Sequence, residues 1–202
     1  LSFGQQPEKI YKTKSGRISY SFDINGMQST YNLVFDDYGT KHAFEYSIIN
    51  QGINEKSKTI ITPANIYIVN YVEKNVIKMP YTNDENDTYD AGNGFDLGKI
   101  AIEVENDISK KTGTEQLLNK TCDVFVYTDG VNKGKYWVWN GILMKADFYD
   151  QDGTHIFIET KELKTDVSIP ASEFEPPTGF AIVDMTQTMD QLQMMFEMQE
   201  EE

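Results

Sequence analysis

Cysteine, histidine and basic residues are scarce in this chain, and each shortage removes a class of function. The 202 residues include one cysteine and two histidines. Cys122 therefore cannot form a disulfide within the chain, so disulfides give no indication of the redox compartment. The formal net charge of −14 argues against a nucleic-acid partner, because a phosphate-binding surface has to be basic. It also disfavours electrostatic docking on anionic lipid.

Long apolar runs and the motifs of common enzyme classes are also missing. No run approaches the roughly 20 residues of a membrane-spanning helix, so we predict a protein that is not integral to a membrane. The sequence contains no glycine-rich phosphate loop, no Gly-x-Ser-x-Gly elbow and no Cys-x-x-Cys pair. No carboxylate pair for glycoside hydrolysis stands out among its 32 acidic residues. We therefore predict a protein that is not an enzyme and has no cofactor.

The few residues with catalytic or metal-binding chemistry are better explained as structural. His42 and His155 fall in separate predicted strands, and no spacing gathers acidic residues or Cys122 around them, so we predict no metal site. Cys122 would need a histidine base to act as a nucleophile, and it is better explained as a small buried hydrophobe. In the acidic loop of residues 83–98, Tyr89 takes the place of the glycine that an EF-hand calcium loop requires. A solvated loop is favoured there over weak calcium binding.

Alternating apolar positions dominate what remains, and they predict β-strands with one apolar face. The first three strands have their apolar positions at Ile18, Tyr20, Phe22 and Ile24; at Tyr31, Leu33 and Phe35; and at Phe44, Tyr46 and Ile48. Asn25-Gly26 predicts a two-residue hairpin turn between the first two. The pattern therefore predicts an antiparallel meander.

The stretch from Lys135 to Lys145 contains both tryptophans and predicts a further hairpin. Because Trp137 and Trp139 are two residues apart, they lie on one face of a strand. Asn140-Gly141 tolerates positive φ and can form a type I′ turn. In the returning strand, one alternating face is predicted to carry Ile142, Met144, Ala146 and Phe148.

The remaining segments give a mixed set of predictions. Residues 5–16 are predicted to form a loosely docked arm or short helix, and residues 51–58 a polar loop. In the strand near Ile66, both faces are apolar, which indicates cover on both sides. An amphipathic helix, with Asp96 as N-cap and Gly113 just past its end, is predicted from the stripe Leu97, Ile100, Ala101, Val104 and Ile108. Proline-punctuated segments at 167–177 suit a sheet edge, and a last short strand is predicted around Ile182.

The two ends of the chain differ from its middle. Residues 1–4 resemble the remnant of a secretory signal peptide, with small residues at Ser2 and Gly4 before a cleavage point. Residues 5–184 are predicted to form a single domain. Residues 185–202 are rich in methionine and predict an amphipathic C-terminal helix or tail. This segment either docks on its own core or is partly disordered; the alternative is that it covers a cavity mouth or mediates self-association.

Short motifs in the second half of the chain carry a family resemblance. In order they are Gly113-Thr114-Glu115; Leu118-Asn119-Lys120-Thr121-Cys122-Asp123-Val124; Trp137-Val138-Trp139-Asn140-Gly141-Ile142 with Lys145; Val167-Ser168-Ile169-Pro170; and Phe174-Glu175-x-Pro177-x-Gly179. In these motifs the chain resembles an uncharacterised family of exported Gram-negative proteins. That family is similar in turn to the outer-membrane lipoprotein carriers and the mycobacterial lipid-binding lipoproteins. The first half of the chain matches only in strand pattern.

The resemblance implies a mainly β (α+β) fold, in which a curled antiparallel sheet forms an unclosed half-barrel with a few helices on its concave face. It also implies a periplasmic or secreted protein that binds an apolar small molecule or acyl chain. Asn119 stands where the family pattern has glycine, and the arginine that holds the carriers' lid has no counterpart here, so delivery of lipoproteins is not implied.

The aromatic content adds an expectation about the pocket. Twelve tyrosines and eleven phenylalanines exceed what a flat sheet with one small helix could bury, so the sheet either is covered on both faces or curls around a ligand site. We expect the ligand-binding residues to be Tyr20, Phe22, Phe44, Trp137 and Trp139. The alternative is a structural or protein-interaction module of the cell envelope, with a fully packed core and no ligand.

Overall fold

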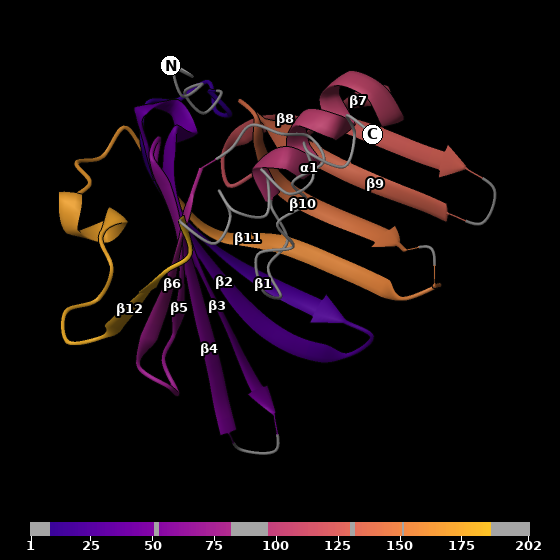
Figure 1. Ribbon diagram of the computed structural model, residues 1–202. Helices are drawn as coiled ribbons and strands as arrows, with labels where there is room; N and C mark the ends of the chain where they lie inside the picture. The colour runs from indigo at the N-terminus through magenta and orange to yellow at the C-terminus, as the bar shows by residue number, and fades with distance from the viewer. Residues whose placement is uncertain (1–8, 51–52, 82–96, 130–131, 151, 187–202) are drawn as a thin grey trace, which may run out of the picture.

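A single twelve-stranded sheet, curved but not closed, organises the protein in the computed structural model (Figure 1). The structure describes residues 9–50, 53–81, 97–129, 132–150 and 152–186. The strands are β1 Gly16–Ile24, β2 Met27–Asp36, β3 Lys41–Asn50, β4 Ile53–Ile61, β5 Asn65–Asn70, β6 Asn75–Pro80, β7 Lys110–Leu117, β8 Lys120–Asp129, β9 Asn132–Trp139, β10 Ile142–Tyr149, β11 His155–Thr165 and β12 Ala181–Asp184. Their spatial order is β12-β6-β5-β4-β3-β2-β1-β11-β10-β9-β8-β7.

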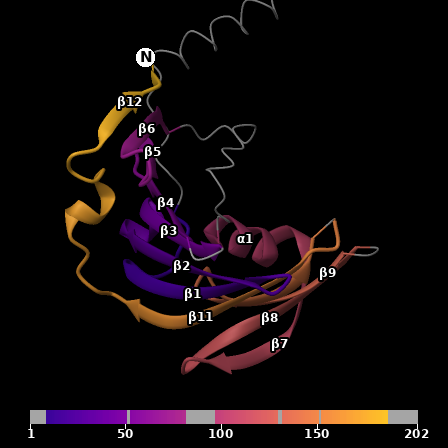
Figure 2. The same cartoon turned by 90° about the horizontal axis from the view of Figure 1, so that it is seen from below.

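The sheet bends into an arc with its one described α-helix on the concave side (Figure 2). This helix, α1 (Leu97–Glu103), continues as a π-helical turn, η2 (Val104–Ile108), and packs on β10. Its buried side chains Leu97, Ala101 and Val104 belong to the main hydrophobic core. The predicted half-barrel, mainly β and unclosed, is confirmed. The predicted helical stripe is also found, although the described residues contain one α-helix rather than a few.

The strand register assigns every side chain to one of two faces, because paired residues point to the same side of a sheet. Phe44 pairs with Leu33, Leu33 with Ile18, Phe22 with Ile158, Ile158 with Ala146, and Ala146 with Tyr136. We call the face that these residues share the inner face, since it is the concave face on which α1 lies. The opposite face is the outer face.

Stacked rings at the centre of the inner face join three neighbouring strands, β1, β2 and β3. The Tyr31 ring lies 5.5 Å from the Phe22 ring and 5.4 Å from the Phe44 ring, centroid to centroid, and meets Tyr20 edge-on at 5.9 Å. All four residues are buried. Each such pair contributes about 0.5–1.5 kcal/mol beyond the burial of its area. The alternation read from the first three strands therefore forms the central wall of the core.

The two predicted Asn-Gly turns are found where expected. Asn25 and Gly26 have φ of 51° and 87°, and Asn140 and Gly141 have φ of 52° and 75°. In each case the flanking residues pair directly, Ile24 with Met27 and Trp139 with Ile142. Positive φ at both turn residues is the type I′ geometry, whose twist matches that of the strands.

Two boundary predictions are wrong. Residues 53–58, predicted as part of a polar loop, are the first part of β4, because β3 supplies a hydrogen-bonding partner along their whole length. Gly113, predicted just past the helix, lies inside β7, since the helical segment ends at Ile108. In both segments the side chains are largely polar, so apolar periodicity gave no strand signal.

A β-bulge also corrects the predicted face of the returning tryptophan-hairpin strand. The pairing of β10 with β9 shifts between Leu143 and Lys145. Ile142 therefore shares the face of Trp139, whereas Ala146 shares the face of Tyr136. An inserted residue reverses the alternation beyond it, so Ile142 and Ala146 lie on opposite faces instead of one.

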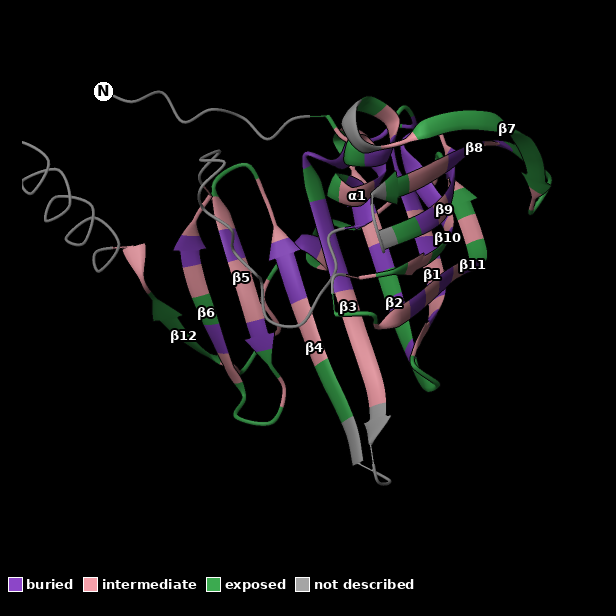
Figure 3. Cartoon of the chain, turned by 90° about the vertical axis from the view of Figure 1, so that its right-hand side faces the viewer, coloured by how far each residue is buried: buried purple, intermediate pink, exposed green. Residues whose placement is uncertain are grey.

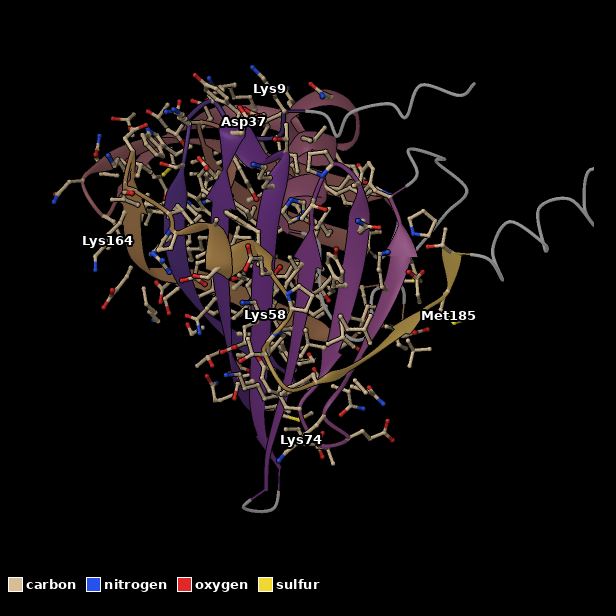
Figure 4. All side chains as sticks on the ribbon, turned by 60° about the vertical axis from the view of Figure 1, so that its left-hand side comes forward. Lys9, Asp37, Lys58, Lys74, Lys164 and Met185 are labelled. Atoms are coloured by element: carbon tan, nitrogen blue, oxygen red, sulfur yellow. The ribbon has the colours of Figure 1, made fainter. Side chains whose placement is uncertain are left out.

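The outer face of the central strands is covered by the chain's own C-terminal segment. Residues 166–180, which we call the strap, run from β11 across the outer face to the far edge of the sheet (Figure 4). The strap includes the 3-10 helix η3 (Ala171–Phe174), whose Phe174 is buried against Ala43, Ile60, Val69 and Val76. The Glu173 carboxylate forms salt bridges with Arg17 at 2.7 Å and with Lys58 at 3.9 Å. The predicted two-sided cover of the strand near Ile66 is confirmed, since Ile66 and Val69 are both buried.

The N-terminal arm is docked more firmly than predicted. Tyr11 is buried, and its ring centroid lies 4.2 Å from that of Phe35. The backbone N–H groups of Ile10 and Tyr11 donate to the carbonyl of Tyr38, and that of Lys12 donates to Asn140 at 3.0 Å. The arm therefore connects the tryptophan-hairpin turn with the η1 turn (Asp37–Gly39).

The two Asn-Gly turns offer a test of this docking. A Cβ at Gly141 would lie 2.6 Å from the Ile10 carbonyl oxygen, whereas one at Gly26 would meet nothing within 4 Å. Both positions have positive φ, so the backbone strain of alanine is shared. We expect Gly141→Ala to lower the free energy of unfolding by about 1 kcal/mol more than Gly26→Ala in urea denaturation, because it displaces the arm. Equal losses in the two variants would contradict the docking.

The contact between the strap and the outer face gives a second testable prediction. Phe174→Ala removes a buried aromatic ring from the outer-face cluster, so we expect a loss of about 3 kcal/mol in the free energy of unfolding. The neighbouring exposed residue provides the control, and Glu175→Ala should change stability by less than about 0.5 kcal/mol. A Phe174→Ala variant as stable as that control would show that the strap does not cover the sheet.

Candidate ligand-binding face

The inner face of β3–β6 and β12 presents apolar side chains beyond the part of the sheet on which α1 packs. Register places on this face Tyr46, Ile48, Ile61, Ile68, Ile77 and Val183. All six retain exposure, and Ile77 and Val183 are 38% and 47% exposed. Among the described helices, α1 packs on β10, at the other end of the arc. This region, which we call the apolar inner patch, is the candidate ligand-binding face.

A buried histidine lies at one end of this patch. His42 pairs with Phe35 and Ile61, which places it on the inner face. Its Nδ1 lies 2.9 Å from the Gly39 carbonyl oxygen, and because a carbonyl only accepts, Nδ1 is the protonated nitrogen. Nε2 is buried and has no hydrogen-bond partner among the described residues. A buried acceptor of this kind is the group that a water molecule or a ligand hydroxyl satisfies.

The five predicted ligand-binding residues are not brought together. Tyr20, Phe22 and Phe44 lie on the inner face, but they are buried in the packed aromatic wall, and burial raises the pKa of Tyr20. Trp137 pairs with Lys145 and Val124, on the outer face, and Trp139 shares that face. One pocket lined by all five is therefore excluded by the register. A ligand contact at Tyr20, Phe22 or Phe44 stays a prediction.

Charged side chains surround Trp137 on the outer face. The indole N–H donates to Glu115 at 2.7 Å, and Lys135 donates to the same carboxylate at 2.8 Å. These two hydrogen bonds hold the pKa of Glu115 below its usual range. The ammonium groups of Lys135 and Lys145 lie 4.5 and 4.8 Å from the Trp137 ring centroid. Trp137 is only 4% exposed, so the cluster closes over the indole and leaves little of it for a ligand.

The remaining chemistry-bearing residues form no reactive group. Cys122 is buried, and burial raises the pKa of its thiol to about 11, which disfavours the thiolate. His155 lies 2.8 Å from Asp147 on an exposed part of the sheet, away from Cys122. The described residues contain no group of three or more His, Cys, Asp or Glu side chains that could hold a metal ion. Most of the acidic loop 83–98 lies outside the described residues, as do residues 1–4 and 187–202.

Two cavities lie away from the apolar inner patch. One, of about 330 Å³, is polar and is lined by residues that include Lys14, Asp36 and Asp166. The other, between Leu117, Met144 and Thr160, measures about 90 Å³ and is too small for a lipid chain. No helix in the described ranges is long and apolar enough to cross a bilayer. The apolar inner patch therefore remains the surface best suited to an apolar ligand.

Comparison with known proteins identifies the fold but not a close relative. No protein-family model and no curated protein matches the chain. An uncharacterized conserved protein from Thermus thermophilus superposes with a TM-score of 0.55 at 11% identity, over 86% of this chain and 91% of its own. MucB, in the complex structure of Pseudomonas aeruginosa MucA/MucB, gives a TM-score of 0.54 at 9% identity, over 87% of this chain and 60% of its own.

A protein of the LolA superfamily from Nitrosomonas europaea also matches, over 82% of this chain and 91% of its own, at 11% identity. Its TM-score of 0.37 is too low to carry an argument about function. At these identities the likeness to the Thermus structure and to the MucA/MucB complex is one of fold alone.

Proposed function

We propose that this protein is an exported, non-enzymatic binding protein that holds an apolar ligand, such as an acyl chain, on the apolar inner patch. The observation that carries the proposal is the row Ile68, Ile77 and Val183, which pair across β5, β6 and β12, with Ile61 diagonally adjacent on β4. All four side chains are partly exposed. Contiguous apolar surface of this kind, on a concave face, is typical of ligand sites.

The chemistry of the patch favours a flexible hydrocarbon chain. Its side chains are aliphatic apart from Tyr46, and they recur at the strand spacing of about 4.8 Å. Each methylene transferred from water to such a surface contributes roughly 0.8 kcal/mol. Ten buried methylenes therefore supply on the order of 8 kcal/mol before the cost of association.

A second candidate function is a protein-interaction module of the cell envelope. The observation that favours it is the MucA/MucB complex, in which a protein with this fold is bound to another protein. The apolar inner patch would then receive side chains of a partner instead of a hydrocarbon chain. The two functions predict different ligands for the same surface.

A charged substitution in the apolar inner patch tests whether the patch binds the ligand. Ile77→Glu puts a carboxylate on the inner face of β6, and Val72→Glu puts the same group at a position that is 85% exposed in the β5–β6 turn. We expect the Kd of a fluorescent fatty acid, measured by titration of delipidated protein, to rise at least 10-fold in Ile77→Glu, because burial of the charge opposes the hydrocarbon chain. Val72→Glu should bind like the unmodified protein.

The thermal midpoint of both variants is measured alongside, so that unfolding is not mistaken for loss of binding. Unmodified protein that binds neither the fluorescent fatty acid nor a fatty alcohol would refute the ligand proposal. Equal affinities of both variants would show that a ligand binds elsewhere.

A further inference from the structure

The open sheet has two edges, and the chain protects them unequally. At one edge, β7 carries Lys110 and Lys111, and its pairing with β8 is interrupted by a bulge between Lys111 and Gly113. Lysines and bulges on an edge strand oppose the addition of a further strand. The β7 edge therefore has the features by which natural sheets prevent unwanted pairing.

At the other edge, β12 lacks these features. Its four residues, Ala181–Asp184, are all exposed and contain no lysine, and they pair with β6 without a bulge (Figure 3). Ile182 and Val183 are 56% and 47% exposed. Because Ile182 shares the face of Val76 and Val183 shares that of Ile77, apolar surface is open on both faces of this edge.

The backbone of β12 also has free hydrogen-bonding groups. The N–H of Ala181 donates to the Lys74 carbonyl at 3.0 Å, and that of Met185 donates to the Lys78 carbonyl at 2.8 Å. Alternate residues of a strand direct their N–H and C=O groups to opposite sides. The backbone groups of Ile182 and Asp184 consequently point away from β6, where no described strand pairs with them.

The edge is held in place for such pairing. Lys78 donates to the Asp184 carboxylate at 2.7 Å, and the backbone N–H of Thr186 donates to the same group at 3.0 Å. The strap, which crosses the outer face, leads directly into β12 and so fixes its position at this edge. A preformed strand loses little conformational entropy when another strand is added.

We propose that β12 is a docking edge for an extended, basic peptide segment of a partner protein, which adds as a further strand of the sheet. Charge selects this occupant. The chain has a net charge of −14. A second copy of the chain would bring the same charge against this edge, whereas a basic segment is attracted to it.

The partner segment has a definable pattern. Two successive apolar residues would cover Ile182 and Val183 on the two faces, and lysine or arginine would flank them. Main-chain hydrogen bonds to Ile182 and Asp184 supply affinity, and the side chains supply specificity. This inference rests on the backbone groups of the sheet edge, which the apolar ligand proposed above does not use, although Val183 belongs to both surfaces.

The probe is a fluorescein-labelled peptide, Lys-Lys-Thr-Val-Ile-Thr-Lys-Lys, titrated against the full chain and followed by fluorescence anisotropy. Strand addition uses only alternate amides of the peptide. N-methylation of the amides on one edge should therefore weaken binding at least 10-fold, whereas N-methylation of those on the other edge should leave it unchanged. A peptide with glutamate in place of lysine should bind at least 10-fold more weakly.

The protein-side variant is Ile182→Pro, which removes a backbone donor that β6 does not use, a substitution that edge strands tolerate. It should weaken peptide binding at least 10-fold, whereas Ile182→Thr, which retains the donor and β-branching, should weaken it less. Unchanged hydrogen exchange of the β6 amides would show that β12 remains paired. Equal binding of the two N-methylated peptides, or full binding by Ile182→Pro, would overturn the proposal. Dimerisation of the protein alone that Ile182→Pro abolishes would also overturn it, in favour of a second copy.

Discussion

The stack of rings around Tyr31 is the interaction on which the rest of the structure depends. Tyr31 contacts Tyr20, Phe22 and Phe44 across three neighbouring strands, with centroid distances between 5.4 and 5.9 Å. These rings share the concave face of the curved sheet. That curvature gives the protein a concave face, and it places α1 inside the arc. The apolar inner patch and the free edge at β12 both lie on the arm of the arc beyond this stack.

Different segments of the chain cover the two faces of the sheet. On the outer face, the strap covers the central strands with Phe174 and is tied down by Glu173. On the inner face, α1 packs on β10, and the strands from β3 to β6 keep partly exposed aliphatic side chains. A protein that only needed a packed core could have covered both faces alike. Among the described residues, this unequal cover is the basis on which we propose the inner face as the ligand-binding face.

Strand alternation and turn chemistry predicted the antiparallel meander and its hairpins, whereas the unclosed half-barrel was implied by the family resemblance. Asn25-Gly26 and Asn140-Gly141 identified two hairpins, because few other pairs tolerate positive φ at both positions. The first part of β4 and all of β7 were missed, since polar side chains there hide strands that backbone pairing alone defines.

The ligand-binding residues stay a prediction, and the structure adds only which face of the sheet each of them occupies. The two tryptophans were predicted to line the same pocket as Tyr20 and Phe22. Whether residues of β9 and β1 lie on the same face of the sheet depends on the strand register across β10 and β11, which no local sequence pattern encodes. The aliphatic residues of β4–β6 could be recognised in the sequence as apolar positions of predicted strands. Their partial exposure follows from the position of α1, which only the fold determines.

Methyl chemical-shift mapping by NMR tests the central claim most directly. With a fatty alcohol added to the isotope-labelled protein, we expect the largest shift changes at the methyl groups of Ile61, Ile68, Ile77 and Val183. The indole signals of Trp137 and Trp139 should remain unchanged, because both rings lie on the outer face. Shift changes centred on the tryptophans, or none at saturating ligand, would contradict the assignment of an apolar ligand to the inner face.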